Sequence, residues 1–362
     1  MSLVPANVER LIPYVPGKPV EELERELGIT GAVKLASNEN PRGPSPKALE
    51  AMREAASGVA RYPDAATWHL RSALAEHHGV ERDEIVLGNG SNEIIDLVCR
   101  TYAGPDDHAV IGVPSFVCYY LGLTAANVPF DAVPLREHLF WDLGAMMERV
   151  TDKTRLFFVA NPNNPTGTHV GRADLERCLR ELPDDVLVVL DEAYVEFADA
   201  DDYVTGLELR GLRERLLVLR TFSKAYGLAG TRCGYAVGSA DLVGYLNRTR
   251  APFNVNAIAQ AGALAALSDP GHVAEYVALN RTERARITEA LTDMGLRVAP
   301  SQANFVFADF ARPNKEVYDL MLRKGVIIRP MPAPVDTWLR ITVGLKEEND
   351  RLIDAVRELV SA

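Results

Sequence analysis

The chain has 362 residues, of which 47% are hydrophobic and 25% charged, an ordinary composition for a globular protein that is long enough for two domains. Its formal net charge of -11 disfavours nucleic acid or an anionic membrane as the main partner, because both reward a basic surface. The first residues contain no apolar segment of signal-peptide length, and no stretch approaches a membrane span.

The cysteines and histidines add two expectations. The four cysteines show no CxxC spacing, which favours free thiols and a cytoplasmic location. The seven histidines show no metal-ligand spacing, so we expect no catalytic metal.

Residues 1–30 are predicted to form an N-terminal arm, because they are rich in proline and glycine and end in a short charged helix, VEELERELG. A short strand at VKLA then runs into a turn rich in Asn, Pro and Gly. Ser45 is expected to cap a helix that has Pro46 at its first position, and a second helix is expected from about Thr67 to Gly79.

Residues 31–250 are predicted to form a large α/β domain. Continuous apolar runs alternate here with amphipathic helical patterns such as RADLERCLREL, and the runs are IVLG, HAVIGV, RLFFVA, DVLVVLD, LLVLRT and YAV. This alternation is typical of a largely parallel sheet covered by helices on both faces. Residues 251–362 combine two long helical patterns with short strands at ANFVFADF, GVIIRPM and WLRITVG. They predict a smaller α+β C-terminal domain.

The unusual polar groups follow the apolar runs, where ligands bind in open parallel sheets. A glycine loop at residues 88–93 opens a helix, which suits a phosphate, although glycine loops also serve merely for turning. Residues 161–167 form a turn-like NPNNPTG segment. Asp191 follows the next apolar run, and an acid there is often only a helix cap. Lys224 follows the run LLVLRT and, taken alone, is more often a solvated lysine than a covalent catalyst.

One chemistry uses all of these groups together. Pyridoxal phosphate needs a lysine for its Schiff base, a carboxylate on its pyridine nitrogen, hydrogen-bond donors on its phenolic oxygen and a cradle for its phosphate. The chain supplies each of these groups in order: a glycine loop, the NPTG turn, D-x-x-Y, S-K and a following arginine. The sequence therefore predicts pyridoxal 5'-phosphate as the cofactor.

The same set of motifs resembles the fold-type I aminotransferases over nearly the whole chain. Within that class the chain resembles the histidinol-phosphate aminotransferases, through the motifs YVPGK at 14–18, NENP at 38–41, RYPD at 61–64, FSKAYGLAGTRCGY at 222–235 and LRITVG at 339–344. The resemblance implies a large domain with a mostly parallel seven-stranded sheet between helices, a smaller C-terminal domain, and a homodimer with shared active sites. It also implies transfer of the amino group of L-histidinol phosphate to 2-oxoglutarate, in histidine biosynthesis.

The resemblance also implies a role for each site residue. Lys224 would form the Schiff base and shuttle a proton, Asp191 would pair with the pyridinium nitrogen, and Tyr194 would bind the phenolic oxygen together with Asn164. Phe116 would stack on the ring. The implied phosphate ligands are Ser91, Asn92, Thr221, Ser223, Arg232 and, from the partner subunit, Tyr62. Arg340 would bind the acidic group of either substrate, and the other implied substrate contacts are Tyr14, Asn40 and Arg329.

Two departures from the family pattern bear on the substrate. Phe116 stands where a tyrosine is usual, and the segment at 331–336 lacks a common Tyr-Gly pair near the expected substrate site. An aromatic amino acid aminotransferase is therefore the alternative, and a threonine-phosphate decarboxylase a further one. A non-catalytic protein of the same fold, such as a regulator, has no support, since every cofactor position is filled and no basic patch is attached.

Overall fold

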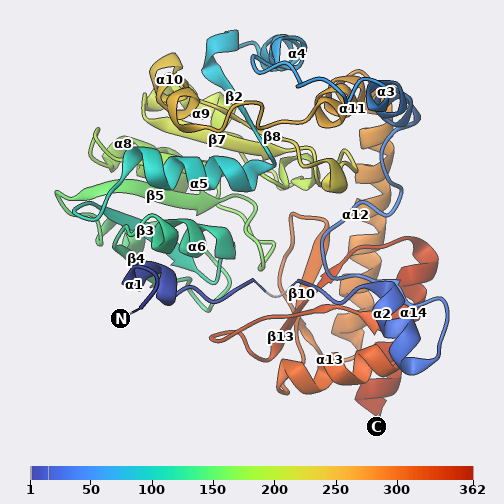
Figure 1. Cartoon of the computed structure of the whole chain (residues 1–362). Coiled ribbons are helices and arrows are strands. Elements are labelled where there is room, and N and C mark those ends of the chain that lie inside the picture. The colour runs from blue at the N-terminus through green and yellow to red at the C-terminus, as the bar shows by residue number, and fades with distance from the viewer. Residues whose placement is uncertain (1, 15, 362) are drawn as a thin grey trace.

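A computed structural model describes residues 2–14 and 16–361 of the chain; Val15, within the YVPGK motif, lies outside the described residues. Its largest sheet has seven strands in the order β2-β8-β7-β6-β5-β3-β4 (Figure 1). All neighbouring strands are parallel except for the two pairs that involve β8. The strands are β2 (Ile85–Gly88), β3 (His108–Val113), β4 (Phe130–Pro134), β5 (Thr154–Ala160), β6 (Leu187–Asp191), β7 (Leu216–Thr221) and β8 (Gly234–Val237). The prediction of a mostly parallel seven-stranded sheet is confirmed.

The predicted strands of this sheet are buried, as their continuous apolar runs indicate. In β6, for example, every residue is buried. β4 is the strand that the sequence pattern did not reveal, because it lies at the edge of the sheet and Val133 is its one buried residue.

Helices pack on this sheet and beside it. They are α3 (Pro46–Ala56), α4 (Trp68–His78), α5 (Ser91–Tyr102), α6 (Val117–Ala125), α7 (Leu143–Met147), α8 (Arg172–Glu181), α9 (Gly206–Leu209), α10 (Ala240–Thr249) and α11 (Ala257–Leu267). Short 3₁₀ turns lie at Arg82–Glu84, Val195–Phe197, Arg210–Leu212 and Ala229–Thr231. Ser45 caps α3 as expected, since its side chain accepts a hydrogen bond from the Ala48 N–H.

A smaller unit of helices and short strands lies at the other end of the molecule (Figure 1). Its antiparallel sheet has the order β12-β13-β10-β9. The strands are β9 (Arg297–Val298), β10 (Phe305–Asp309), β12 (Arg329–Pro330) and β13 (Trp338–Thr342), and the helices are α12 (Pro270–Asp293), α13 (Asn314–Arg323) and α14 (Lys346–Ser361). The expected α+β character of this unit is confirmed.

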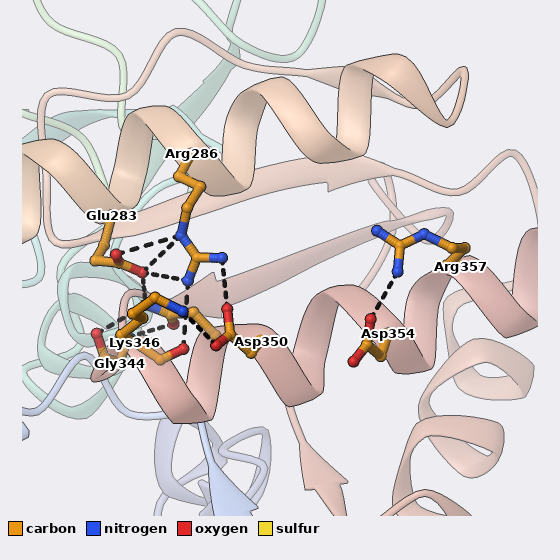
Figure 2. Close-up of polar contacts among 8 residues, drawn as sticks. Glu283, Arg286, Gly344, Lys346, Asp350, Asp354 and Arg357 are labelled. Atoms are coloured by element: carbon orange, nitrogen blue, oxygen red, sulfur yellow. Dashed lines mark hydrogen bonds and ion pairs between the residues drawn. The ribbon is translucent and has the colours of Figure 1, made fainter.

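The two long helices of this unit are joined by polar contacts (Figure 2). Arg286 of α12 contacts Glu283 on its own helix at 2.5 Å and Asp350 of α14 at 2.7 Å. Asn349 of α14 donates a hydrogen bond to the same Glu283 at 2.7 Å. Since Glu283 and Asn349 are buried, these contacts satisfy polar groups that burial would otherwise penalise.

The N-terminal residues contact both units. The arm contains α1 (Ala6–Glu9) and α2 (Val20–Leu27), and α1 packs against α6 of the large unit. β1 (Val33–Lys34) pairs in parallel with β11 (Val326–Ile327) of the smaller unit. Beyond residue 250, helix α11 still packs on α3 and α4. The division into 1–30, 31–250 and 251–362 stays a prediction.

The cysteines Cys99, Cys118, Cys178 and Cys233 all carry free thiols. Among the described residues, no helix has the length and apolar character needed to cross a membrane. No group of three or more His, Cys, Asp or Glu side chains within residues 2–14 and 16–361 is arranged to hold a metal ion.

Gly112 of β3 packs closely against its surroundings. A Cβ at Gly112 would lie 2.2 Å from Trp141 Cζ3 and 2.9 Å from Leu135 Cδ1. The Trp141 ring is held in place, because its Nε1–H donates to the Ala160 carbonyl at 2.9 Å. We expect Gly112→Ala to lower the free energy of unfolding by about 1–3 kcal/mol, measured by urea denaturation.

Gly244→Ala is the matched control. Gly244 lies inside α10 with no atom within 4 Å of an added Cβ, so alanine there is expected to raise stability by about 0.5–1 kcal/mol. Equal effects of the two substitutions would contradict the packing assigned to Gly112.

Candidate active site

The carboxyl ends of β5, β6 and β7 lie side by side. Their register pairs Ala160 with Asp191 and Asp191 with Leu219, so the segments after the three strands begin at the same edge of the sheet. A pocket of about 390 Å³ opens there. Its lining includes these residues predicted for the site: Tyr14, Ser91, Asn92, Phe116, Asn164, Asp191, Tyr194, Thr221, Ser223, Lys224, Arg232 and Arg340.

Asp191 is the buried carboxylate of this pocket. Tyr119 Oη donates to Asp191 Oδ2 at 2.7 Å, and the Ala193 N–H donates to Oδ1 at 3.2 Å. Burial raises the pKa of Asp191 to about 6, and the Tyr119 hydrogen bond opposes this rise. The neighbouring Glu192 does not line the pocket; it forms a buried ion pair with Arg220 at 2.8 Å.

Lys224 brings its amine to the same pocket from the loop after β7. The Nζ atom donates to the Ser37 carbonyl at 3.2 Å. Burial lowers the pKa of Lys224 to about 7, and the nearby positive charge of Arg340 lowers it further. A substantial fraction of this amine is therefore neutral and nucleophilic at neutral pH.

Hydrogen-bond donors approach the pocket from Asn164, Tyr194 and Arg340. Arg340 donates through Nη1 to Asn164 Oδ1 at 2.6 Å and through Nη2 to the Ala36 carbonyl at 2.6 Å. Because Oδ1 of Asn164 accepts from Arg340, the amide Nδ2 is its donor end. Arg340 Nε is buried and has no hydrogen-bond partner among the described residues.

The N-terminus of α5 forms an anion cradle with the loop after β7. Ser91 and Asn92 begin α5, where free backbone N–H groups and the helix dipole favour an anion. Thr221 Oγ1 donates to Ser223 Oγ at 2.9 Å beside them. A Cβ at Gly90 would lie 2.3 Å from Arg232 Nη2, so glycine lets the guanidinium lie against this loop.

Phe116 lines the pocket directly before α6. Its ring meets the Tyr119 ring edge to face, with centroids 5.8 Å apart at 85°. Phe116 therefore presents an aromatic surface to the pocket without a hydroxyl group.

Three predicted residues do not line the pocket. Asn40 is buried, and its amide is engaged with backbone groups, donating to the Ala225 carbonyl at 3.0 Å and accepting from the Arg42 N–H at 2.9 Å. Tyr62 is 82% exposed and stacks on Phe253 with centroids 4.6 Å apart. Arg329 lies with its Cζ 5.3 Å from the centroid of the Tyr14 ring, next to the pocket. The roles expected of these three residues stay predictions.

The segment at 331–336 also lies outside the pocket lining, although we expected it near the substrate. Val335 and Met331 pack into a cluster with Phe307 and Trp338. Asn314 Nδ2 donates to the Met331 carbonyl at 2.5 Å and the Trp338 carbonyl at 3.0 Å, which anchors the segment on the smaller unit.

The sequence reasoning missed Asn38 and Tyr119. Asn38 was noticed only as part of the NENP motif, and it donates through Nδ2 to Tyr194 Oη at 2.9 Å. Tyr119 is three residues after Phe116, and this helical spacing was the one available signal. Ser37 and Glu39 also line the pocket without having been predicted.

The chain belongs to the class I and II aminotransferase family, whose model matches residues 30–356. The relatives it resembles include a histidinol-phosphate aminotransferase of Anaeromyxobacter sp. (strain Fw109-5), 46% identical over 100% of both chains. Histidinol-phosphate aminotransferase 2 of Pseudomonas aeruginosa is 47% identical over 100% of this chain and 98% of its own. The crystal structure of histidinol-phosphate aminotransferase from Sinorhizobium meliloti in complex with pyridoxal-5'-phosphate has a TM-score of 0.90 and 29% identity, covering 100% of this chain and 98% of that one.

These comparisons confirm the predicted fold class and the prediction of an aminotransferase enzyme. Pyridoxal phosphate, the cofactor of this family, is confirmed with them. The donor set of the pocket fits that group, because one amine, one buried carboxylate, an aromatic ring and an anion cradle meet in a single cavity.

Asp191 makes the stability of the apoprotein depend on pH. The usual pKa of an aspartate is near 3.8, so between about pH 4 and 6 the unfolded chain ionises this group before the folded chain does. The folded state therefore loses about 3 kcal/mol, in order of magnitude, as the pH rises through this window, and the loss persists above it.

We expect apo Asp191→Asn to be more stable than the unmodified apoprotein above about pH 6, and equally stable near pH 3.8. Urea unfolding of both proteins across this pH range measures the difference. Asp174→Asn, at a half-exposed surface ion pair, is the control and should leave this pH dependence unchanged. An Asp191→Asn variant that gains nothing above pH 6 would contradict the buried charge.

Lys224 should control the rate at which the apoprotein captures its cofactor. Because only the neutral amine attacks an aldehyde, the rate should rise with pH and level off above about 7, as the lowered pKa of Lys224 requires. Stopped-flow absorbance after mixing with pyridoxal phosphate measures this profile.

Arg340→Met removes the nearby positive charge and should move the pH midpoint of the capture rate upward. A midpoint near 10 in the unmodified protein would show that the amine of Lys224 is not buried.

Proposed function

We propose that this aminotransferase moves the amino group of L-histidinol phosphate to 2-oxoglutarate, giving imidazole acetol phosphate and L-glutamate in histidine biosynthesis. The observation that carries the proposal is full-length similarity to histidinol-phosphate aminotransferases, combined with a pocket that gathers Lys224, Asp191 and Arg340.

When bound, pyridoxal phosphate supplies the electron sink that allows an amino group to be exchanged for a keto group. Lys224 would hold the cofactor and then carry the proton between the substrate carbon and the cofactor. Asp191 would keep the pyridine nitrogen protonated, while Tyr194 and Asn164 would donate hydrogen bonds to the phenolic oxygen. Phe116 would cover one face of the ring.

The phosphate of the cofactor would lie in the cradle at the start of α5. Its ligands would be the backbone and side-chain groups of Ser91 and Asn92, the hydroxyls of Thr221 and Ser223, and the guanidinium of Arg232. The side-chain hydroxyls and the helix N-terminus give this cradle both hydrogen bonds and positive potential.

Arginines beside the pocket suit substrates that carry acidic groups. Arg340 has one buried Nε–H without a partner among the described residues, and its side chain reaches the pocket between Ala36 and Asn164. Arg329 and Tyr14 lie together at the mouth and would bind the substrate phosphate. Asn40 is a further proposed substrate contact, and its amide also binds the Ala225 carbonyl and the Arg42 N–H.

We propose a homodimer with shared sites, in which Tyr62 of each subunit reaches the cofactor phosphate of the other. Tyr62 fits this role because it is exposed on its own subunit and its ring is held against Phe253. A cytoplasmic location is proposed as well, supported by the free thiols.

An aromatic amino acid as donor is the alternative, favoured by Phe116 at the pocket. The missing Tyr-Gly pair at 331–336 does not add to this alternative, because that segment packs against Trp338 and Phe307 outside the pocket lining.

A half-reaction titration separates the two donors. The protein loaded with pyridoxal phosphate is given one amino donor without acceptor, and the visible absorption of the bound cofactor is followed. We expect L-histidinol phosphate to bleach this band at concentrations at least tenfold lower than L-phenylalanine, since a phosphate carries more negative charge and one more oxygen than the phenylalanine carboxylate and so allows at least one further charge-assisted contact.

Lys224→Ala is the control and should bind cofactor without turnover. Phenylalanine as the better donor would replace the histidine-pathway function by the aromatic one. Bleaching by neither donor would leave only the aminotransferase class.

A further inference from the structure

We propose that Asn38 is a positioning residue that fixes the Tyr194 hydroxyl as a hydrogen-bond donor into the pocket, through a directed chain of hydrogen bonds that starts at Thr342 of the smaller unit. The proposal rests on the proposed place of the cofactor beside Tyr194, and not on the identity of the amino donor.

The chain begins at the end of β13. The backbone N–H of Asn38 donates to Thr342 Oγ1 at 2.9 Å, and Thr342 Oγ1 in turn donates to Asn38 Oδ1 at 3.1 Å. A backbone N–H can only donate, and a hydroxyl has a single proton. The threonine hydroxyl accepts from the backbone N–H and gives its own proton to Asn38 Oδ1, and this contact marks the oxygen end of the Asn38 amide.

The other end of that amide sets the direction at Tyr194. With Oδ1 held by Thr342, the Nδ2–H₂ group faces Tyr194 Oη and donates to it at 2.9 Å. The phenol accepts this bond, so its own single proton is directed away from Asn38. Tyr194 lines the pocket, and its proton is thus available to an acceptor bound there.

The surroundings hold Asn38 firmly. Asn38 is 1% exposed and has a positive φ of 55°, a conformation that asparagine and aspartate tolerate better than most residues. Asn304 Nδ2 donates to the Asn38 carbonyl at 3.1 Å, and Asn304 directly precedes β10. Thr342 pairs with Phe305 in the neighbouring strand. Strands β10 and β13 of the smaller unit therefore support the side chain of Asn38, which contacts Tyr194 just after β6.

This arrangement has a chemical consequence for the bound cofactor. A phenol that must donate stabilises a negatively charged oxygen next to it, whereas a phenol that is free to turn can also present its lone pairs. Through Tyr194, Asn38 and Thr342 thus favour the ionised form of the cofactor's phenolic oxygen.

Asn38→Asp tests the direction of the chain, because a carboxylate of the same shape accepts hydrogen bonds and donates none. The phenol would then donate to Asp at position 38 instead of into the pocket. The readout is the pH midpoint of the visible absorption band in the protein loaded with pyridoxal phosphate. We expect Asn38→Asp to raise this midpoint by about one pH unit, the size of one hydrogen bond to an ionised group.

The new charge of Asn38→Asp is controlled by a double-mutant cycle with Tyr194→Phe. If Asn38 acts through the phenol, Tyr194→Phe alone raises the midpoint, and Asn38→Asp raises it clearly less in that background than in the unmodified protein. A shift of the same size in both backgrounds would be a through-space charge effect and would overturn the proposal, as would an unchanged midpoint in Asn38→Asp.

Thr342→Val is a neutral, nearly isosteric companion variant that removes the hydroxyl fixing the Asn38 amide. It should also raise the pH midpoint, by a smaller amount than Asn38→Asp and only when Tyr194 is present. Urea unfolding of each apo variant checks that the variant is folded. No shift in Thr342→Val would show that the amide is fixed by something other than this chain. An unmodified protein that takes up no cofactor at Lys224 would refute the proposed function itself, before the role of Asn38 is tested.

Discussion

The parallel register of β5, β6 and β7 is the constraint on which the rest of the site depends. Because Ala160, Asp191 and Leu219 are aligned across three strands, the chain leaves the sheet at three neighbouring points. This alignment places three parts of the site: the NPNNPTG turn, Asp191 with Tyr194, and the loop that carries Lys224. The apolar runs that build the strands are buried on both faces, so a shift of register would disturb the packing of both faces and would also displace the site residues.

Burial gives the two central ionisable groups their chemistry. The carboxylate of Asp191 and the amine of Lys224 share one cavity, and burial raises the pKa of the first and lowers that of the second. Both shifts reduce the charge that is buried in the pocket. Glu192, adjacent in the chain, pairs with Arg220 and does not line this cavity, so Asp191 is the one of these two neighbouring acids that a ligand would meet.

The smaller unit contributes side chains of β13 to the pocket and to the residues that support it. Arg340 of β13 reaches Asn164 in the turn after β5, and Thr342 of the same strand holds Asn38 against Tyr194. Alternate residues of one short strand therefore set both a candidate substrate contact and the orientation of a cofactor contact. Any displacement of β13 would alter both contacts at once.

Much of this site could be predicted from the sequence because its residues directly follow apolar runs. Lys224, Asp191 and the glycine loop before Ser91 each mark the end of a strand, and their chemical types suit one cofactor. Tyr119 and Asn38 could not be predicted in this way, because their contacts depend on helix packing and on a left-handed turn held by a distant strand. Nor does the sequence show that the segment at 331–336 packs outside the pocket lining, since Asn314 of α13 anchors it there. β4 was missed because an edge strand need not be apolar.

The central claim is that this strand-end pocket holds pyridoxal phosphate on Lys224. Borohydride reduction of the loaded protein, followed by proteolysis and mass spectrometry, makes the attachment permanent and locates it. The account predicts the cofactor's added mass on the peptide that contains Lys224, and no added mass on the corresponding peptide of Lys224→Ala. Attachment at another lysine, or none in the peptide that follows β7, would contradict it.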